Sequence, residues 1–212
     1  YHGVPLVLIE RFNVPELIGI IARHKPPTIG LPPAAIRMIY DANVSKEDLG
    51  TVKSISGGSA PIDSALHDNF EERYGIPLLW GLGATEFCGT IARWTPQDYA
   101  EFGPRKRGSA GRAMTGIELR IVDPETFKVL PAGEEGLMEV LCTAINPDWV
   151  RTTDLAYIDE DGFLFHRGRY DGAIVRGGFK ILPERVAEVL RTHDSVGDAV
   201  VVGKEDARLG MV

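Results

Sequence analysis

One glycine-rich segment, GLGATE at residues 81–86, combines groups that could bind phosphate and a metal ion. Glycines such as Gly81 and Gly83 let a backbone approach a ligand closely. The hydroxyl of Thr85 can donate to a phosphate oxygen, and the carboxylate of Glu86 can hold Mg²⁺ through oxygen. A turn at the end of a strand with a solvated glutamate would use the same residues, so the segment alone leaves both interpretations open.

Two charged residues further along the chain, Asp154 and Arg169, could bind ligands rich in oxygen. An ionised carboxylate can accept hydrogen bonds from two hydroxyls, and charge-assisted hydrogen bonds are worth roughly 1.5–3 kcal/mol each. The guanidinium fork of arginine suits two oxygens. The structural alternatives are an aspartate that caps a hairpin and a surface ion pair between Arg169 and Asp171.

Other segments and residue types give weaker evidence for a binding or catalytic site. The segment SGGSAP at residues 56–61 and the pair Gly177-Gly178 are explained equally well by turns. The five histidines are scattered without partners at metal-ligand spacing, so we assign them no role. Cys88 and Cys142 are too few for a disulfide framework and are expected to be free thiols.

The composition of the chain limits the classes of protein to which it can belong. With 212 residues, 44% of them hydrophobic and 25% charged, the chain can bury a core. Its net charge of -7 argues against a general nucleic-acid surface, and the basic run at 105–107 is expected to be a solvated loop. No apolar run reaches the roughly 20 residues of a membrane span, and no signal sequence is visible. We therefore expect a soluble cytoplasmic enzyme.

The elements that must position these groups alternate in the first half of the chain. Strands are predicted at residues 7–9, 28–30, 52–56 and 77–80. Helices are predicted after the cap Asn13, from Pro32-Pro33, and over residues 63–73. This alternation predicts a layered α/β sheet with ligands in the loops beyond the carboxyl ends of its strands.

The second half is predicted to be mostly β. Residues 117–121 alternate with period two, residues 136–141 are strand-like, and a hairpin turns at residues 159–162 between a strand ending at Ile158 and one at 163–166. The glycines and charges of residues 167–172 predict a surface connection. A helix over residues 183–192 and a strand over 198–203 follow.

The segment GRYDGAIVRGGFKILPERVAEVL, residues 168–190, closely resembles the hinge segment of the adenylate-forming superfamily, which includes acyl-CoA synthetases, peptide-synthetase adenylation domains and firefly luciferase. SGGSAP, GLGATE, GEEGLMEV (133–140) and RTTDLAYIDEDG (151–162) follow the family order, so the resemblance covers nearly the whole chain. It implies an α/β fold in which residues 1–170 are the last part of the large AMP-binding domain. Within it, 1–107 form the α/β layers and 108–170 a distorted β-barrel subdomain, and 171–212 begin a small mobile α+β domain.

The resemblance also implies roles. Thr85, Glu86 and Arg169 would act in catalysis, with Glu86 on Mg²⁺, Asp154 on the ribose, Arg169 on ribose or phosphates, and Asp171 as the hinge. The residues implied to lie along the nucleotide or the CoA path are Gly58, Ser59, Ala60, Pro61, Gly81, Gly83, Gly177 and Gly178. Two departures from the family pattern are Leu82, where an aromatic residue usually stacks on adenine, and Thr153, where a glycine is usual.

The resemblance implies the function of an ATP-dependent acyl-CoA synthetase, which is an acid-thiol ligase of fatty acid metabolism. It would use ATP, Mg²⁺, CoA and a carboxylic acid, and the resemblance leaves a homo-oligomer open. The alternatives are an adenylation domain that loads a carrier protein and a noncatalytic nucleotide-binding scaffold. The family's upstream phosphate loop and its closing catalytic lysine are not in this sequence, so we expect a fragment that is inactive alone.

Overall fold

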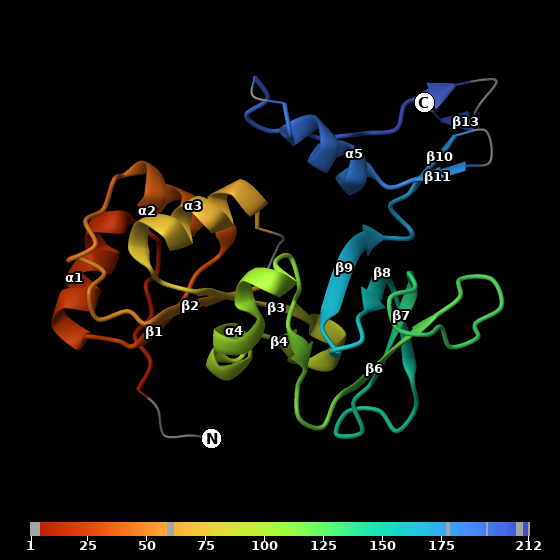
Figure 1. The fold of residues 1–212 in the computed structure, drawn as a ribbon, viewed down its shortest axis with the longest axis horizontal. Coiled ribbons are helices and arrows are strands. Elements are labelled where there is room, and N and C mark those ends of the chain that lie inside the picture. Colours follow the sequence, from red (N-terminus) through yellow and green to blue (C-terminus); the bar gives the residue numbers. More distant parts are fainter. Residues whose placement is uncertain (1–4, 59–61, 177–178, 194, 207–209, 212) are drawn as a thin grey trace. The chain divides into compact units, whose positions relative to one another are not determined.

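The computed structural model describes residues 5–58, 62–176, 179–193, 195–206 and 210–211. The chain divides into two compact units, Tyr1–Gly111 and Arg112–Val212. Both units combine helices with strands, which confirms the predicted α/β class (Figure 1). A domain boundary between residues 170 and 171 stays a prediction.

The first unit is built on a sheet in which β1, β2 and β3 are parallel and β4 is antiparallel to β3. Its elements are α1 (Val14–His24), β1 (Thr28–Gly30), α2 (Pro33–Asp41), β2 (Ser54–Gly57), α3 (Ser64–Tyr74), β3 (Leu78–Ala84), the 3₁₀ helix η1 (Thr85–Phe87), β4 (Gly89–Arg93), α4 (Pro96–Phe102) and the 3₁₀ helix η2 (Gly103–Lys106). Figure 1 shows α2 and α3 side by side along this sheet. Because β1 to β3 are parallel, their carboxyl ends lie at one edge.

The helix starts follow from capping. The side chain of Asn13 accepts the amide N–H of Glu16 at 2.9 Å, and that of Asp63 accepts the amide N–H of Leu66 at 2.8 Å. The apolar faces of these helices and the strands form the core. Its fully buried members include Ile21, Ile36, Ile39, Ile55, Phe70, Tyr74 and Leu78.

A partly buried carboxylate, Glu71 on α3, holds together the start of β3 and the region of α4. Its Oε1 accepts the amide N–H of Leu78 at 2.8 Å, and its Oε2 accepts from Tyr99 at 2.5 Å and from Arg107 at 2.7 Å. Burial raises the pKa of Glu71, but hydrogen bonds from His67, Tyr99, Leu78 and Arg107 outweigh it and lower that pKa to about 2. The ionised form is thus strongly favoured in the fold.

Acid should therefore weaken the protein through Glu71. Since its folded-state pKa lies below the ordinary value of 4.5, the stabilisation is present above pH 4.5 and is lost as the pH falls toward 2. The loss should be about 3 kcal/mol in the free energy of unfolding. Urea unfolding between pH 6 and pH 2.5 would measure it against Glu71→Gln, with the exposed Glu72→Gln as control. Parallel pH curves for wild type and Glu71→Gln would contradict the assignment.

The second unit contains two sheets. Its elements are β5 (Arg112–Ala113), β6 (Glu118–Val122), β7 (Gly136–Leu141), β8 (Val150–Ile158), β9 (Leu164–Arg169), β10 (Ile174–Arg176), β11 (Phe179–Ile181), α5 (Pro183–Arg191), β12 (Glu205–Asp206) and β13 (Gly210–Met211). Strands β6 to β9 form an antiparallel sheet in sequence order, and the other sheet has the order β11-β10-β13-β12. The predicted hairpin is confirmed as β8 and β9. In the described part of the chain the β6–β9 sheet is open and does not close into a barrel.

Helix α5 begins against the β6–β9 sheet. Leu182 and Tyr170 pack on a small buried cluster of Val122, Leu137 and Leu155. Arg185 on α5 also forms an ion pair with Glu135, just before β7. These few contacts attach the segment after Asp171 to the sheet.

Three predicted elements are wrong. Residues 7–9 are not a strand, and Val7 and the neighbouring Leu8 are 46% and 86% exposed. Residues 198–203 are not a strand either, with Val200 and Val202 largely exposed. In both places an apolar run lacks a partner strand among the described residues, and a strand needs one to satisfy its backbone groups. The predicted connection at 167–172 begins later, because β9 continues to Arg169.

Two further findings concern membrane-spanning helices and the cysteines. In the described residues no helix is long and apolar enough to cross a membrane. Cys88 is exposed, Cys142 is buried, and both are free, which confirms the prediction of unpaired thiols.

Candidate functional site

In the first unit, residues 56–58 of SGGSAP and the GLGATE motif lie at neighbouring strands. Gly57 at the end of β2 is opposite Trp80 of β3. A Cβ added at Gly58 would lie 2.4 Å from the carbonyl oxygen of Gly81, so no larger residue fits there. Two segments that are distant in sequence therefore meet at the carboxyl ends of parallel strands, where ligands bind in sheets of this type.

The glycines of GLGATE also have a packing role. A Cβ at Gly81 would lie 2.8 Å from the carbonyl oxygen of Ala92, and one at Gly83 would lie 2.6 Å from that of Gly89. Both contacts are to β4, which pairs with this part of β3. Close strand packing thus suffices to require glycine at both positions, and their nucleotide contact stays a prediction.

Thr85 and Glu86 lie in η1, the tight turn that follows β3. Both are exposed, whereas the next residue, Phe87, is buried and anchors the turn. Cys88 closes it in the left-handed region at φ 54°, with its N–H donating to the carbonyl of Thr85 at 3.0 Å. The turn presents a hydroxyl and a carboxylate to solvent together.

Glu86 offers one carboxylate as a metal ligand, and this suits only certain metals. Within the described residues no group of three or more His, Cys, Asp or Glu side chains could hold a metal ion. Mg²⁺ is usually bound by one or two carboxylates together with substrate phosphates and water. Glu86 as a single carboxylate therefore fits Mg²⁺ carried by a polyphosphate better than a metal held by protein ligands alone.

In the second unit, Asp154 lies where β8 departs from regular pairing with β7. Leu155 is opposite Leu137 and Arg151 is opposite Glu139, so residues 152–154 face Met138 alone. The hydroxyl of Thr152 donates to the carbonyl of Met138 at 3.0 Å and accepts the amide N–H of Asp154 at 3.1 Å.

The hairpin turn itself is capped by a different residue. Asp159 accepts the amide N–H groups of Asp161 and Phe163 with the same oxygen, Oδ1, at 3.0 and 2.9 Å. Asp154 is therefore not the cap that the sequence offered as its structural alternative.

Arg169 at the end of β9 forms a two-pronged ion pair with Asp171. Its Nε and Nη2 donate to the two carboxylate oxygens of Asp171 at 3.0 and 2.8 Å, and Nη2 also donates to Thr153 at 2.8 Å. The guanidinium of Arg169 holds the pKa of Asp171 below its usual value. The structure thus contains the surface ion pair, and a contact of Arg169 with nucleotide stays a prediction.

One residue of this site was missed from the sequence. His166 on β9 donates from Nε2 to Oδ1 of Asp154 at 3.0 Å, because an ionised carboxylate can only accept. The pairing of β8 with β9 shifts here: Leu155 is opposite Gly168, but Ala156 is opposite His166. Histidine spacing along the chain could not reveal this contact, since it depends on an irregular strand pair.

Five predicted site residues lie outside the described residues, so their placement stays open. They are Ser59, Ala60, Pro61, Gly177 and Gly178.

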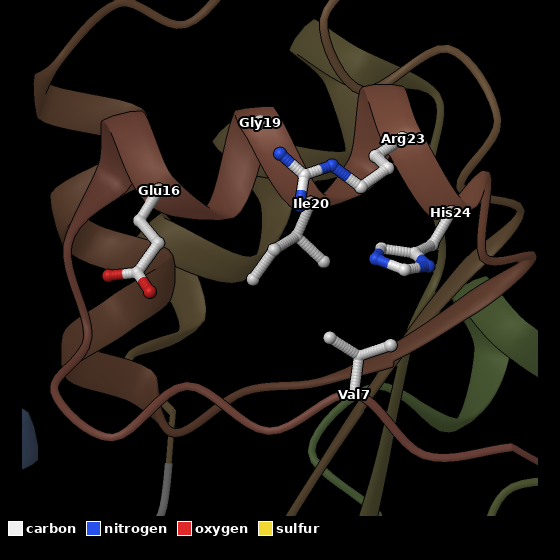
Figure 2. A pocket seen from close by; sticks show the side chains of 6 residues that line it. All are labelled: Val7, Glu16, Gly19, Ile20, Arg23 and His24. Carbon is white, nitrogen blue, oxygen red and sulfur yellow. The ribbon is translucent and has the colours of Figure 1, made fainter.

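Two pockets lie away from these motifs. The first has a volume of about 420 Å³ and lies beside α1 in the first unit; Figure 2 shows Ile20, His24 and Val7 around its centre. The second, of about 380 Å³, lies between β8 and α5 in the second unit and is lined partly by Leu155, Tyr170 and Leu182. Neither is lined by a residue that the sequence assigned to the site.

Comparison with known proteins gives a consistent family. The model of the AMP-binding enzyme family matches residues 1–142. The chain is 30% identical to 2-succinylbenzoate--CoA ligase from Bacillus pumilus over all of its length and 45% of that protein. It thus spans less than half of this curated relative.

Solved structures agree. The chain matches o-succinylbenzoate CoA synthetase from Bacillus subtilis, solved with the acyl-adenylate intermediate OSB-AMP, with a TM-score of 0.78 and 29% identity over 95% of this chain and 43% of that one. ATP-bound MatB from Rhodopseudomonas palustris gives a TM-score of 0.84 and 25% identity over 96% and 42%.

Proposed function

Because this chain belongs to the AMP-binding enzyme family, we propose that the full natural protein is an ATP-dependent acyl-CoA synthetase. A carboxylate oxygen of the substrate attacks the α-phosphorus of ATP, and the bond to the leaving pyrophosphate breaks. The thiol of CoA then attacks the acyl carbon of the adenylate and displaces AMP. The observation that supports this proposal most is the meeting of SGGSAP and GLGATE at one sheet edge, in a fold shared with structures holding ATP and an acyl-adenylate.

Each site residue has a separate role in this proposal. In the first unit, the hydroxyl of Thr85 donates to a phosphate oxygen and Glu86 holds Mg²⁺, which would neutralise phosphate charge. The backbone at Gly58, Gly81 and Gly83 borders the nucleotide. Ser59, Ala60 and Pro61 are proposed to bind the nucleotide as well.

In the second unit, Asp154 accepts the ribose hydroxyls and Arg169 donates to ribose or phosphate oxygens. Asp171 is the hinge about which residues 171–212 turn between the two half-reactions. Gly177 and Gly178 leave room for the pantetheine arm of CoA.

The direct test is pyrophosphate exchange with the full natural protein. Acid-dependent exchange of labelled pyrophosphate into ATP should appear with one member of a panel that includes 2-succinylbenzoate and straight-chain fatty acids. Addition of CoA should then give a thioester and AMP. Exchange without thioester formation from CoA would favour a carrier protein as acceptor, and ATP binding without exchange would favour a noncatalytic scaffold.

Glu86→Gln should raise the Mg²⁺ concentration needed for half-maximal exchange by about tenfold. Losing one charged oxygen ligand costs roughly 1.4 kcal/mol or more of metal binding. A magnesium titration at saturating ATP would measure this, with Glu47→Gln, another exposed glutamate of the first unit, as the matched control. An unchanged magnesium requirement would remove Glu86 from the metal site.

A further inference from the structure

The contact between His166 and Asp154 exists because β9 contains one extra residue. In a regular ladder, opposite residues share a face of the sheet and alternate residues along a strand do the same. Asp154 is opposite Arg169 and Ala156 is opposite His166, so residues that are two positions apart on β8 have partners that are three positions apart on β9. The bulge thereby places both His166 and Arg169 on the face that carries Asp154.

Gly168 makes this bulge possible. Its φ of 117° lies in a region that side chains rarely adopt, and a Cβ there would lie 3.0 Å from the carboxylate of Glu184 on α5. Without the extra residue, Arg167 would be opposite Ala156 in place of the histidine. The bulge therefore places the imidazole of His166, in place of the Arg167 side chain, opposite Ala156 and within hydrogen-bond distance of Asp154.

The pair is partly shielded from water. The side chains of Asp154 and His166 are 23% and 25% exposed, and their atoms are 3.0 Å apart. A carboxylate on a strand can rotate about two side-chain bonds, and a hydrogen bond to Oδ1 restricts that rotation. The His166 contact uses Oδ1 alone, so the other oxygen, Oδ2, keeps acceptor capacity for a ligand.

We propose that His166 is a positioning residue that orients Asp154 for the ribose and so sets the selectivity for ribonucleotides over 2′-deoxyribonucleotides. This inference rests on the proposed function, in which Asp154 accepts the ribose hydroxyls. An oriented carboxylate binds two hydroxyls without first losing rotational freedom, so preorganisation adds to affinity. A carboxylate that rotates freely would gain less from the 2′-hydroxyl and would distinguish the two nucleotides less well.

A purely structural role makes a different prediction. Next to His166, Phe165 stacks on Tyr157 with ring centroids 4.7 Å apart, and this contact also ties β9 to β8. If His166 only stabilised the hairpin, weakening that stack should affect nucleotide selectivity as much as losing the histidine. The variant Phe165→Leu is therefore the matched control.

The experiment compares ATP with 2′-deoxy-ATP in pyrophosphate exchange by the full natural protein. His166→Leu should lower the ratio of kcat/KM for the two nucleotides about tenfold through the KM for ATP, which corresponds to about 1.4 kcal/mol. His166→Gln, whose amide nitrogen can donate in place of Nε2, should keep the ratio within about threefold of wild type. Phe165→Leu should lower Tm and leave the ratio unchanged.

A double-mutant cycle separates this inference from the proposed function. In Asp154→Asn, the further change His166→Leu should have no additional effect on the ratio, because a positioning residue acts only through its partner. If Asp154→Asn loses selectivity and both His166→Leu and His166→Phe keep it, the positioning role is wrong and the site stands. If wild type exchanges no pyrophosphate with any acid, the proposed function fails and the inference fails with it.

Discussion

Asp154→Ala should raise the KM for ATP about 100-fold in the full natural protein, the largest effect expected from a single side chain of the site. The change removes an acceptor for two ribose hydroxyls, and charge-assisted hydrogen bonds contribute roughly 1.5–3 kcal/mol each. It also leaves the Nε2 of His166, now 3.0 Å from Oδ1 of Asp154, without this acceptor. Initial rates of pyrophosphate exchange over a wide range of ATP concentration would measure the effect.

The control for this prediction is Asp148→Ala, because Asp148 is an exposed aspartate of the same unit in the loop before β8. It removes the same charge without touching the irregular part of the strand. The KM for the carboxylic acid should stay within about threefold in both variants, since the ribose contact does not involve the acid. An ATP dependence that is unchanged in Asp154→Ala would take this residue out of the nucleotide site.

Local signals in the sequence were sufficient where a single residue determines the backbone. The sequence around Asn13 predicts a helix cap, and its side chain accepts the amide N–H of Glu16 as that pattern requires. The acids and glycine at residues 159–162 predict a turn, and Asp159 caps it with two hydrogen bonds. Periodicity likewise located β7 and the helix α5 within a residue or two.

Features that depend on pairing between strands could not be predicted in this way. The strands predicted at 7–9 and 198–203 have the apolar pattern of strands but no neighbour to pair with in the described residues. The His166 contact needs a bulge whose position follows from Gly168 and the approach of Glu184, 16 residues later. The low pKa of Glu71 similarly depends on Tyr99 and Arg107, which are distant in sequence.

A rotation of residues 171–212 about Asp171, as proposed, would have to break the contacts around this residue. Arg169 holds Asp171 by two hydrogen bonds, and both side chains are exposed, at 61% and 50%. Beyond it, Leu182 packs on the sheet and Arg185 pairs with Glu135. Exposed ion pairs contribute about 0–1 kcal/mol each, so breaking these two pairs in a rotation about Asp171 would cost little.

Asp171→Pro should therefore slow one half-reaction about 100-fold more than the other. Adenylate formation and thioester formation need different surroundings, and a rotation about a few backbone dihedrals would supply both. Proline fixes φ near −65° and also restricts the preceding Tyr170, so one of the two orientations becomes strained. Pyrophosphate release would report the first half-reaction, and attack of CoA on preformed acyl-adenylate would report the second.

Asp171→Ala is the matched control for this prediction, since it removes the ion pair with Arg169 and leaves φ unrestricted. If the hinge acts through its dihedral angles, alanine should change the ratio of the two half-reactions by less than about threefold, while proline changes it strongly. If alanine and proline shift the ratio equally, the ion pair and not the backbone rotation controls the step. Equal losses in both half-reactions for proline, with a lowered Tm, would mean that Asp171 only stabilises the fold, because a fixed pivot must penalise one orientation more than the other.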